Sequence, residues 1–452
     1  MSFTAWSVLL DIGSICGLLL IGKLVRAKVR WVQRLLLPAS IIAGVLGLAL
    51  GPNGAGLIPF SSQLGTYATI LTAVVFGALP LTDSFAVRGK IRSARVMWSY
   101  SVSSYVLQWG LGLLFAIAVL GWFFDLPDGF GLLLAAGWAG GFGTASAVGG
   151  TLSDAGWQEA TSLGFTSATV GVVVCIVGGL VLVKWGAKYS RGSAAGVADL
   201  PESMRTGLLA APEEREPIGR ATVSPSSLEP LAMQLSLVVI VTLAGYLATK
   251  GFALLFPDVS VPVFAAAFLC GLLLRTVIDR TPAREYLDGA TIKSISGSAT
   301  DFLVATGIAS IVPSVVAGYA VPLALLMVFG LVYCLLIFRY LTPRMFGEQW
   351  LERGLFTWGW STASIATGLA LLRIVDPRLK SGTVEEFGLA YVGFGPVEIL
   401  LAIVAPIAVV AGFTGSFITA TIVFGVALLV LTFVRRWPAA HQRAGTAAAE
   451  QQ

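Results

Sequence analysis

The sequence has few charged residues: Asp, Glu, Lys and Arg together make up only 12% of its 452 residues. A typical soluble domain contains about 25% charged residues, so this is not the composition of a soluble protein. Apolar residues make up 56% of the chain, and they gather in long runs with the charges between them, as membrane-spanning helices require. The sequence therefore predicts an all-α polytopic membrane protein.

Histidine and cysteine are also scarce, and their positions exclude several kinds of site. The single histidine, His441, lies in the polar C-terminal tail, so no histidine proton relay crosses the membrane. The cysteines, at positions 16, 175, 270 and 334, lie in different apolar runs without the spacing of metal ligands. With no predicted transition-metal site, nucleophile–histidine pair or nucleotide loop, we expect neither an enzyme nor a bound organic cofactor.

Eleven apolar runs are predicted to be membrane spans. They lie near residues 6–25, 35–51, 64–83, 96–123, 163–185, 232–255, 260–276, 296–315, 320–339, 387–410 and 413–434. Two more segments, near 130–152 and 354–375, are too rich in Gly, Ser and Thr to be ordinary lipid-facing helices.

The positions of lysine and arginine test this count. Every loop obeys the positive-inside rule only if both Gly-rich segments enter and leave the membrane on the same side. The predicted topology is eleven crossings of the inner (plasma) membrane, with the N-terminus outside and the C-terminus inside. The net charge of +5 is accounted for by cytoplasmic loops and indicates no nucleic-acid partner.

The chain is predicted to contain two related halves. Thr144-Ala145-Ser146 recurs as Thr362-Ala363-Ser364 at an offset of 218 (362 − 144), and Pro38 with Gly47 recurs as Pro262 with Gly271 at 224 (262 − 38). Each half has five spans, an odd number, so the second copy enters the membrane from the opposite side, as in many secondary transporters. The predicted organisation is a first inverted repeat at 1–187, a cytosolic linker at 188–230, a second repeat at 231–411, an additional transmembrane helix at 412–436 and a cytosolic tail at 437–452.

The two Gly-rich segments are predicted to be re-entrant hairpins that form a binding site. Irregular backbone is tolerated at membrane depth only beside protein or a watery cavity. Hydroxyls and helix N-termini would bind an anionic substrate, and freed carbonyls would bind a small cation. Alternatively, the small residues only let helices pack closely. The candidate residues are Gly140, Gly141, Gly143, Thr144 and Ser146 in the first hairpin and Gly359, Ser361, Thr362, Ser364 and Thr367 in the second.

Ionisable residues inside spans are further candidates, because each is costly in hydrocarbon unless paired or hydrated. Glu398 lies about twelve residues into its span, near the midplane at about 1.5 Å per residue. It would ligate sodium, carry a proton or pair with a buried donor. Asp301 and Asp83 lie near the inner ends of their spans. Two interpretations remain for each, a coupling site and a solvated helix end.

The chain resembles the glutamate:sodium symporter family over most of its length. The resemblance is carried by "LLLPASIIAGVLGLALG" at 35–51, "GGFGTASA" at 140–147, "VPVFAAAFLCGLLL" at 261–274 and "FGLAYVGFGPVEILLAIVAP" at 387–406. It implies ten core spans in two inverted halves, two re-entrant hairpins, a homodimer, and a transport domain that moves against a scaffold. It also places Gly140, Gly141, Gly143 and Thr144 at the first hairpin tip, and Gly359, Ser361, Thr362 and Ser364 at the second.

The chain departs from the family pattern near these tips. Phe142 stands where the first motif usually has histidine, and Trp358 and Trp360 are large for a tip and would narrow the substrate space. The span near 413–434 is additional. These departures leave the substrate open among glutamate, related amino acids and small carboxylates.

The sequence thus favours sodium-coupled symport of such a substrate by an elevator-like alternating-access mechanism. Sodium is the expected coupling ion, at the hairpin tips, and the other expected partners are the lipid bilayer and a second copy of the chain. Two alternatives remain open. One is a proton-coupled transporter of another small organic anion, with Glu398 as the carrier, and the other is a passive facilitator or channel.

Overall fold

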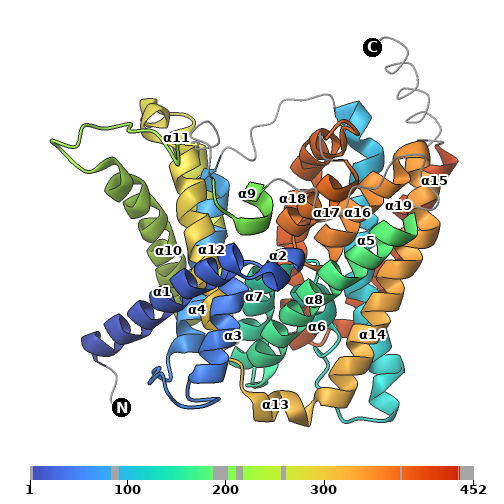
Figure 1. Cartoon of the computed structure of the whole chain (residues 1–452), viewed down its shortest axis with the longest axis horizontal. Helices are drawn as coiled ribbons and strands as arrows, with labels where there is room; N and C mark the ends of the chain where they lie inside the picture. Colours follow the sequence, from blue (N-terminus) through green and yellow to red (C-terminus); the bar gives the residue numbers. More distant parts are fainter. Residues whose placement is uncertain are drawn as a thin grey trace. The chain divides into compact units, whose positions relative to one another are not determined.

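The structure of the chain is a computed structural model (Figure 1) that describes residues 4–82, 91–186, 202–209, 217–255, 261–376, 379–435 and 437. Throughout these residues the regular secondary structure is helical and contains no strand. The prediction of an all-α chain is therefore confirmed for the part that the structure describes.

Eight helical segments of the described residues are long and apolar enough to cross a membrane. They are α1 (Ala5–Lys28), Leu64–Leu81, Ala94–Trp122, α8 (Ala160–Gly186), α10 (Pro230–Leu255), Ala320–Thr362, α18 (Thr383–Val410) and α19 (Thr414–Val434). The chain is accordingly a multi-pass membrane protein, while the count of eleven crossings stays a prediction.

The spans predicted near 35–51 and 260–276 form shorter apolar helices, α3 (Ala39–Leu50) and α11 (Val263–Ile278). Each is preceded by a proline at the N-cap, Pro38 in one case and Pro262 in the other. The corresponding prolines of the two halves thus have the same local role. A proline suits the start of a helix because the first N–H groups have no intrahelical partner.

The span predicted near 296–315 belongs to α12 (Gly289–Ala309), which begins and ends earlier. Asp288 caps this helix: its carboxylate accepts hydrogen bonds from the Thr291 N–H at 3.0 Å and the Arg220 N–H at 2.8 Å. Burial alone would raise the pKa of Asp288, but these bonds, the Thr291 hydroxyl and the charge of Arg220 hold it below its usual value.

The chain forms two compact units that do not follow its two halves. Unit 1 comprises Met1–Leu24, Pro38–Val87 and Leu209–Ile311, and unit 2 comprises Val25–Leu37, Arg88–Leu208 and Val312–Gln452. The first helices of each half therefore belong to unit 1, and the later helices of each half belong to unit 2.

Unit 1 packs its helices through small residues. A Cβ added at Gly47 of α3 would lie 2.9 Å from the Ala309 Cβ of α12, and one at Gly245 of α10 would lie 2.5 Å from the backbone of Ala267 in α11. These glycines allow close approach, and Figure 1 shows α10, α11 and α12 running beside α4 (Leu64–Ala78). For Gly47, the structure thus supports close packing.

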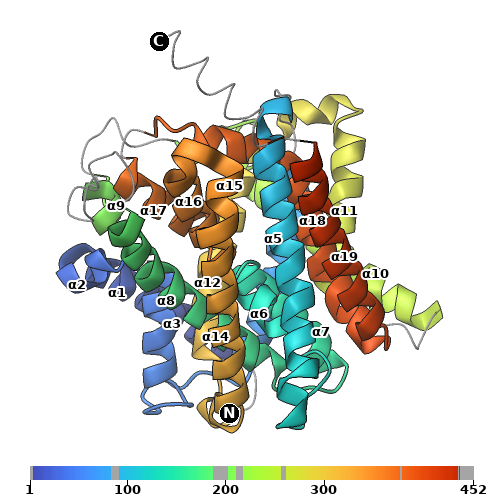
Figure 2. The ribbon, with the colours of Figure 1, turned by 90° about the vertical axis from the view of Figure 1, so that its right-hand side faces the viewer.

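Unit 2 is built around α5 (Ile91–Ala118), which lies between α14 (Ala320–Leu336) and α19 (Figure 2). Its central side chains are buried, with Tyr105 and Trp109 both at most 1% exposed. The additional helix α19 is tightly attached to α5: a Cβ at Gly110 would overlap the Thr421 side chain. The Ser99 and Thr432 hydroxyls also share a hydrogen bond.

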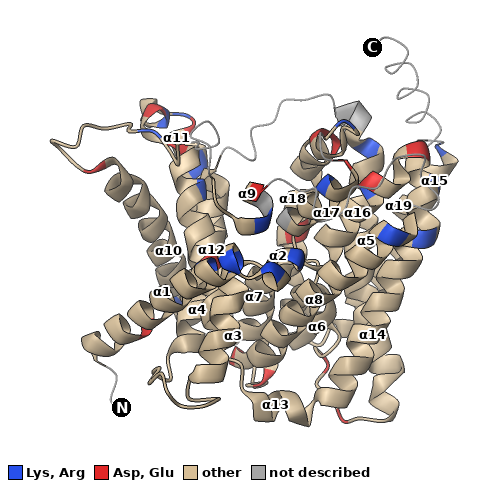
Figure 3. Ribbon diagram, in the orientation of Figure 1, with Lys and Arg blue, Asp and Glu red and all other residues tan. Residues whose placement is uncertain are grey.

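A buried ion pair joins two further helices of unit 2, α16 (Trp350–Thr362) and α18. The Arg353 Nε donates to one Glu386 oxygen at 2.9 Å, and the Nη2 donates to the other at 2.8 Å. Arg353 is only 4% exposed. Charged residues gather around the ends of α15 (Thr342–Phe346), α16 and α17 (Ile365–Val375), whereas no lysine or arginine is drawn beside α13 (Pro313–Gly318) (Figure 3).

Candidate functional site

The first Gly-rich segment folds as two helices with a break between them. Three residues, 138–140, separate α6 (Leu132–Gly137) from α7 (Gly141–Asp154). Gly141 has a φ of +67°, a left-handed conformation that glycine adopts without strain. The turn at this break therefore depends on glycine.

The second Gly-rich segment has the same plan, with α16 and α17 separated by Ala363 and Ser364. Ser364 and Thr367 form a capping box at the start of α17. The Ser364 hydroxyl accepts from the Thr367 N–H at 3.3 Å, and the Thr367 hydroxyl accepts from the Ser364 N–H at 3.1 Å. These two candidate residues thus shape the break.

The two arms of the second hairpin touch through their backbones. A Cβ added at Gly359 of α16 would overlap the Cα of Gly368 in α17, and one at Gly368 would overlap the Phe356 carbonyl. Gly359 therefore lies inside α16, where it lets the arms pack, rather than at the tip where the family pattern places it.

The two breaks meet within unit 2. A Cβ added at Gly141 would lie 3.3 Å from the carbonyl oxygen of Ala363. Gly171 of α8 lies against both breaks. A Cβ added there would lie 2.5 Å from the Thr362 carbonyl oxygen and 2.9 Å from the Trp138 ring, so only glycine fits. The irregular backbone of the first segment is thus in contact with that of the second.

The repeated Thr-Ala-Ser motif has a different position in each hairpin. Thr144 and Ser146 are buried in the first two turns of α7, whereas Thr362 ends α16 and Ser364 caps α17. Nevertheless Gly140, Gly141 and Gly143, which precede or begin α7, are half-buried, so this side of the break is accessible within unit 2.

Most candidate hydroxyls of the second hairpin already have partners in the backbone. The hydroxyls of Ser361 and Thr362 both donate to the Trp358 carbonyl, at 3.2 and 2.7 Å. By contrast, the Ser146 Oγ is buried and has no hydrogen-bond partner among the described residues. Ser146 is therefore a candidate whose buried hydroxyl has no protein partner among the described residues and can bond to a ligand.

The helix ends at the breaks have opposite polarity. The N-termini of α7 and α17 present N–H groups and the positive ends of helix dipoles, which favour an anion. The C-terminus of α16 presents carbonyls and a negative end, which favour a cation. The meeting of these ends can bind a carboxylate and a small cation side by side without a charged side chain.

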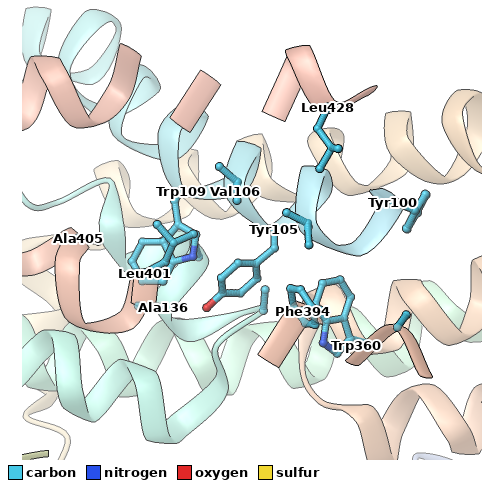
Figure 4. Close-up of a cluster of buried hydrophobic side chains, with 14 of the residues drawn as sticks. Tyr100, Tyr105, Val106, Trp109, Ala136, Trp360, Phe394, Leu401, Ala405 and Leu428 are labelled. Carbon is cyan, nitrogen blue, oxygen red and sulfur yellow. The ribbon is translucent and has the colours of Figure 1, made fainter. Parts of the chain in front are cut away.

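Glu398 lies on α18 beside an aromatic cluster of unit 2. The Tyr391 hydroxyl donates to its carboxylate at 3.1 Å, and the Tyr105 hydroxyl donates to its backbone carbonyl at 3.4 Å. Figure 4 shows Tyr105 near Trp360 and Phe394, with ring centroids 6.2 and 5.4 Å away. Among the described residues, no lysine or arginine forms an ion pair with Glu398.

The large aromatic residues of the hairpins pack into the protein. Trp358 is 2% exposed and donates from Nε1 to the Cys175 carbonyl at 3.1 Å. Trp360 is 1% exposed and its ring lies 4.8 Å from that of Phe394, while Phe142 stacks on Phe165. The two tryptophans therefore anchor α16 in the protein, while their narrowing of the substrate space stays a prediction.

The remaining predicted residues lie elsewhere. Asp301 is on α12 in unit 1 with an exposed side chain, and Asp83 and His441 lie outside the described residues. Gln108 of α5 was not among the predicted residues, although its side chain donates to the Ser361 carbonyl at the second break. In the sequence, the signal that could have identified Gln108 is a polar carboxamide inside an apolar run.

The sequence of the chain matches the family model of the sodium/glutamate symporters over residues 6–356. Together with its apolar helices, this match defines a multi-pass membrane transporter, not an enzyme. The chain belongs to the sodium/glutamate symporter family. The matched range contains the first break and ends within α16, before the second. No curated protein matches the chain.

Proposed function

We propose that the chain is a sodium-coupled symporter of glutamate or a closely related amino acid or small carboxylate. Its family implies symport of glutamate with sodium. The observation that carries the proposal is the meeting of the two helix breaks, at Gly141 and Ala363, within one compact unit.

The polarity of the breaks supports this pair of ligands. The substrate carboxylate takes the N-termini of α7 and α17, with the Ser146 hydroxyl as a buried polar partner. Sodium takes the carbonyls at the end of α16, together with freed backbone oxygens of the first break. Unit 2 then carries both ligands, as an elevator-like, alternating-access mechanism requires.

The proposal extends to the assembly and its orientation. The protein acts as a homodimer in the inner (plasma) membrane, with its N-terminus outside and its C-terminus inside. The two halves are inverted repeats, which is supported by the way each half contributes to both units.

Uptake of labelled glutamate into proteoliposomes tests the function directly. An inward sodium gradient is compared with an equal potassium gradient, and aspartate, glutamine and a dicarboxylate serve as competitors. Sodium-dependent accumulation above the external concentration is expected, and uptake that stops at equal concentrations would identify a passive facilitator or channel instead.

A matched pair of variants links the uptake to the breaks. Ser146→Ala removes a buried hydroxyl without a partner, so substrate affinity is expected to fall. Ser104→Ala removes a buried hydroxyl of α5 that bonds only to carbonyls of its own helix, so uptake should change little. Equal effects of the two variants would contradict a ligand role for Ser146.

A proton-coupled transporter of a small organic anion is the second candidate, favoured by one observation. Glu398 lies in an apolar helix without a basic partner among the described residues, as a proton carrier would. In this second candidate, Glu398→Gln abolishes uptake driven by a pH gradient and wild-type uptake does not respond to sodium. Uptake that follows sodium at fixed pH excludes it.

A further inference from the structure

In the side-chain carboxamide of Gln108, on α5, the nitrogen has a hydrogen-bond partner and the oxygen has none among the described residues. The side chain is 1% exposed. Its Nε2 donates to the Ser361 carbonyl at 3.4 Å and lies 3.9 Å from the Cys334 sulfur. Its Oε1 is buried and has no hydrogen-bond partner among the described residues. An acceptor buried without a partner is unfavourable, so native proteins rarely leave one unexplained.

Through its Nε2, the Gln108 side chain lies against the C-terminal end of α16. The last four carbonyls of a helix have no partner within it and carry its negative end. Here the Thr362 carbonyl lies beside Gly171, and the Ala363 carbonyl lies beside Gly141. The Gln108 carboxamide, held against the Ser361 carbonyl, therefore lies at the same end of α16 as these backbone oxygens.

Such a group of neutral oxygens is suited to a small hard cation. Hard cations prefer carbonyl and carboxylate oxygens, and sodium in transporters is commonly held by unwound carbonyls and the C-terminal ends of half-helices. An anion would be repelled by the same atoms. We propose that Gln108 Oε1 is a ligand of the coupling sodium ion, together with carbonyls at the end of α16, which assigns the ion a partner from outside both hairpins.

This inference rests on the proposed sodium coupling, and its consequence is mechanical. Gln108 belongs to α5, which is the central helix of unit 2, whereas Ser361 belongs to the hairpin. A sodium ion held between them ties the tip of the second hairpin to α5, so release of the ion frees the tip.

Sodium-dependent thermal unfolding of the purified full chain tests the assignment. Sodium chloride is titrated against choline chloride at constant ionic strength, for the wild type, Gln108→Met and Gln108→Glu. Gln234→Met is the control: it removes another buried carboxamide, in unit 1, whose Nε2 donates to the Tyr286 carbonyl and whose Oε1 accepts from the Asp288 N–H.

Gln108→Met keeps the length of the side chain but removes the oxygen, so the half-saturating sodium concentration should rise about 10-fold or more, the loss typical of impaired metal sites. Gln108→Glu retains an oxygen and should keep the sodium response. Gln234→Met should lower the melting temperature at every sodium concentration without moving the half-saturation point.

Two results overturn the assignment while leaving sodium coupling intact. One is a sodium response of Gln108→Met equal to that of the wild type. The other is the same loss of response in Gln108→Met and Gln108→Glu, which would assign the residue to packing or to the Ser361 hydrogen bond. If Gln108→Met does not fold, a Gln108→Glu protein that has lost the response also refutes the ligand role. A wild type that does not respond to sodium refutes the proposed coupling itself.

Discussion

Replacement of Gly359 by alanine is expected to separate the arms of the second hairpin. The added methyl group would overlap the Cα of Gly368, and a backbone atom cannot turn away as a side chain can. Overpacking of this kind costs about 1–3 kcal/mol or more, while alanine gains about 1 kcal/mol over glycine in a helix interior. Taking the upper end of the first range, we expect a net loss of about 2 kcal/mol.

Gly150→Ala is the matched control, because Gly150 lies within α7 of the first hairpin and a Cβ there meets no atom within 4 Å. The same substitution should therefore be neutral or stabilise by up to about 1 kcal/mol. The two variants are compared by thermal unfolding in detergent and by sodium-driven uptake in proteoliposomes. Gly359→Ala should unfold at lower temperature and transport slowly. If Gly359→Ala matches Gly150→Ala in both assays, the close contact between the arms does not exist.

Three further predictions concern charges and caps. Arg353→Met should destabilise the protein by about 3–5 kcal/mol, because it removes both hydrogen bonds that the guanidinium donates to the part-buried Glu386 carboxylate, and a double variant with Glu386→Leu should recover most of that loss in denaturant unfolding. Asp288 has a lowered pKa in the folded state, so the stability it contributes is complete above the unfolded pKa of about 3.9 and is lost as the pH falls through the folded pKa. In Asp288→Asn, the free energy of unfolding should therefore fall less steeply with decreasing pH below about pH 4. An unchanged slope would contradict the role of Asp288 as the cap. Ser364→Ala should cost about 0.5–2 kcal/mol through loss of the cap on α17, measured by thermal unfolding, whereas Ser361→Ala, which loses the bond from its hydroxyl to the Trp358 carbonyl and caps no helix, should cost less.

The positions of the helices and of both breaks could be predicted from the sequence. Long apolar runs identify helices, and a cluster of Gly, Ser and Thr inside such a run marks where a helix stops. The predicted segments 130–152 and 354–375 accordingly contain the breaks at Trp138–Gly140 and Ala363–Ser364. These features are local, and the physical signals for them lie within a few residues.

The roles of individual site residues were less predictable because they depend on contacts between distant segments. Gly359 was expected at a tip but packs against Gly368, and the packing of Trp360 against Phe394 could not be seen in the sequence. Gln108 lies 253 residues from Ser361 in the chain, so no spacing could connect them. The division into two units that mix the halves likewise follows from long-range packing.

The attachment of α19 to α5 has a practical consequence. α19 lies beyond the range that matches the family model, yet the close approach of Gly110 to Thr421 makes it part of unit 2. In the proposed elevator-like mechanism, a fluorophore on a cysteine introduced near the end of α19 would therefore move together with the proposed binding site. Labelling there would leave the breaks untouched and would report directly whether unit 2 moves as proposed.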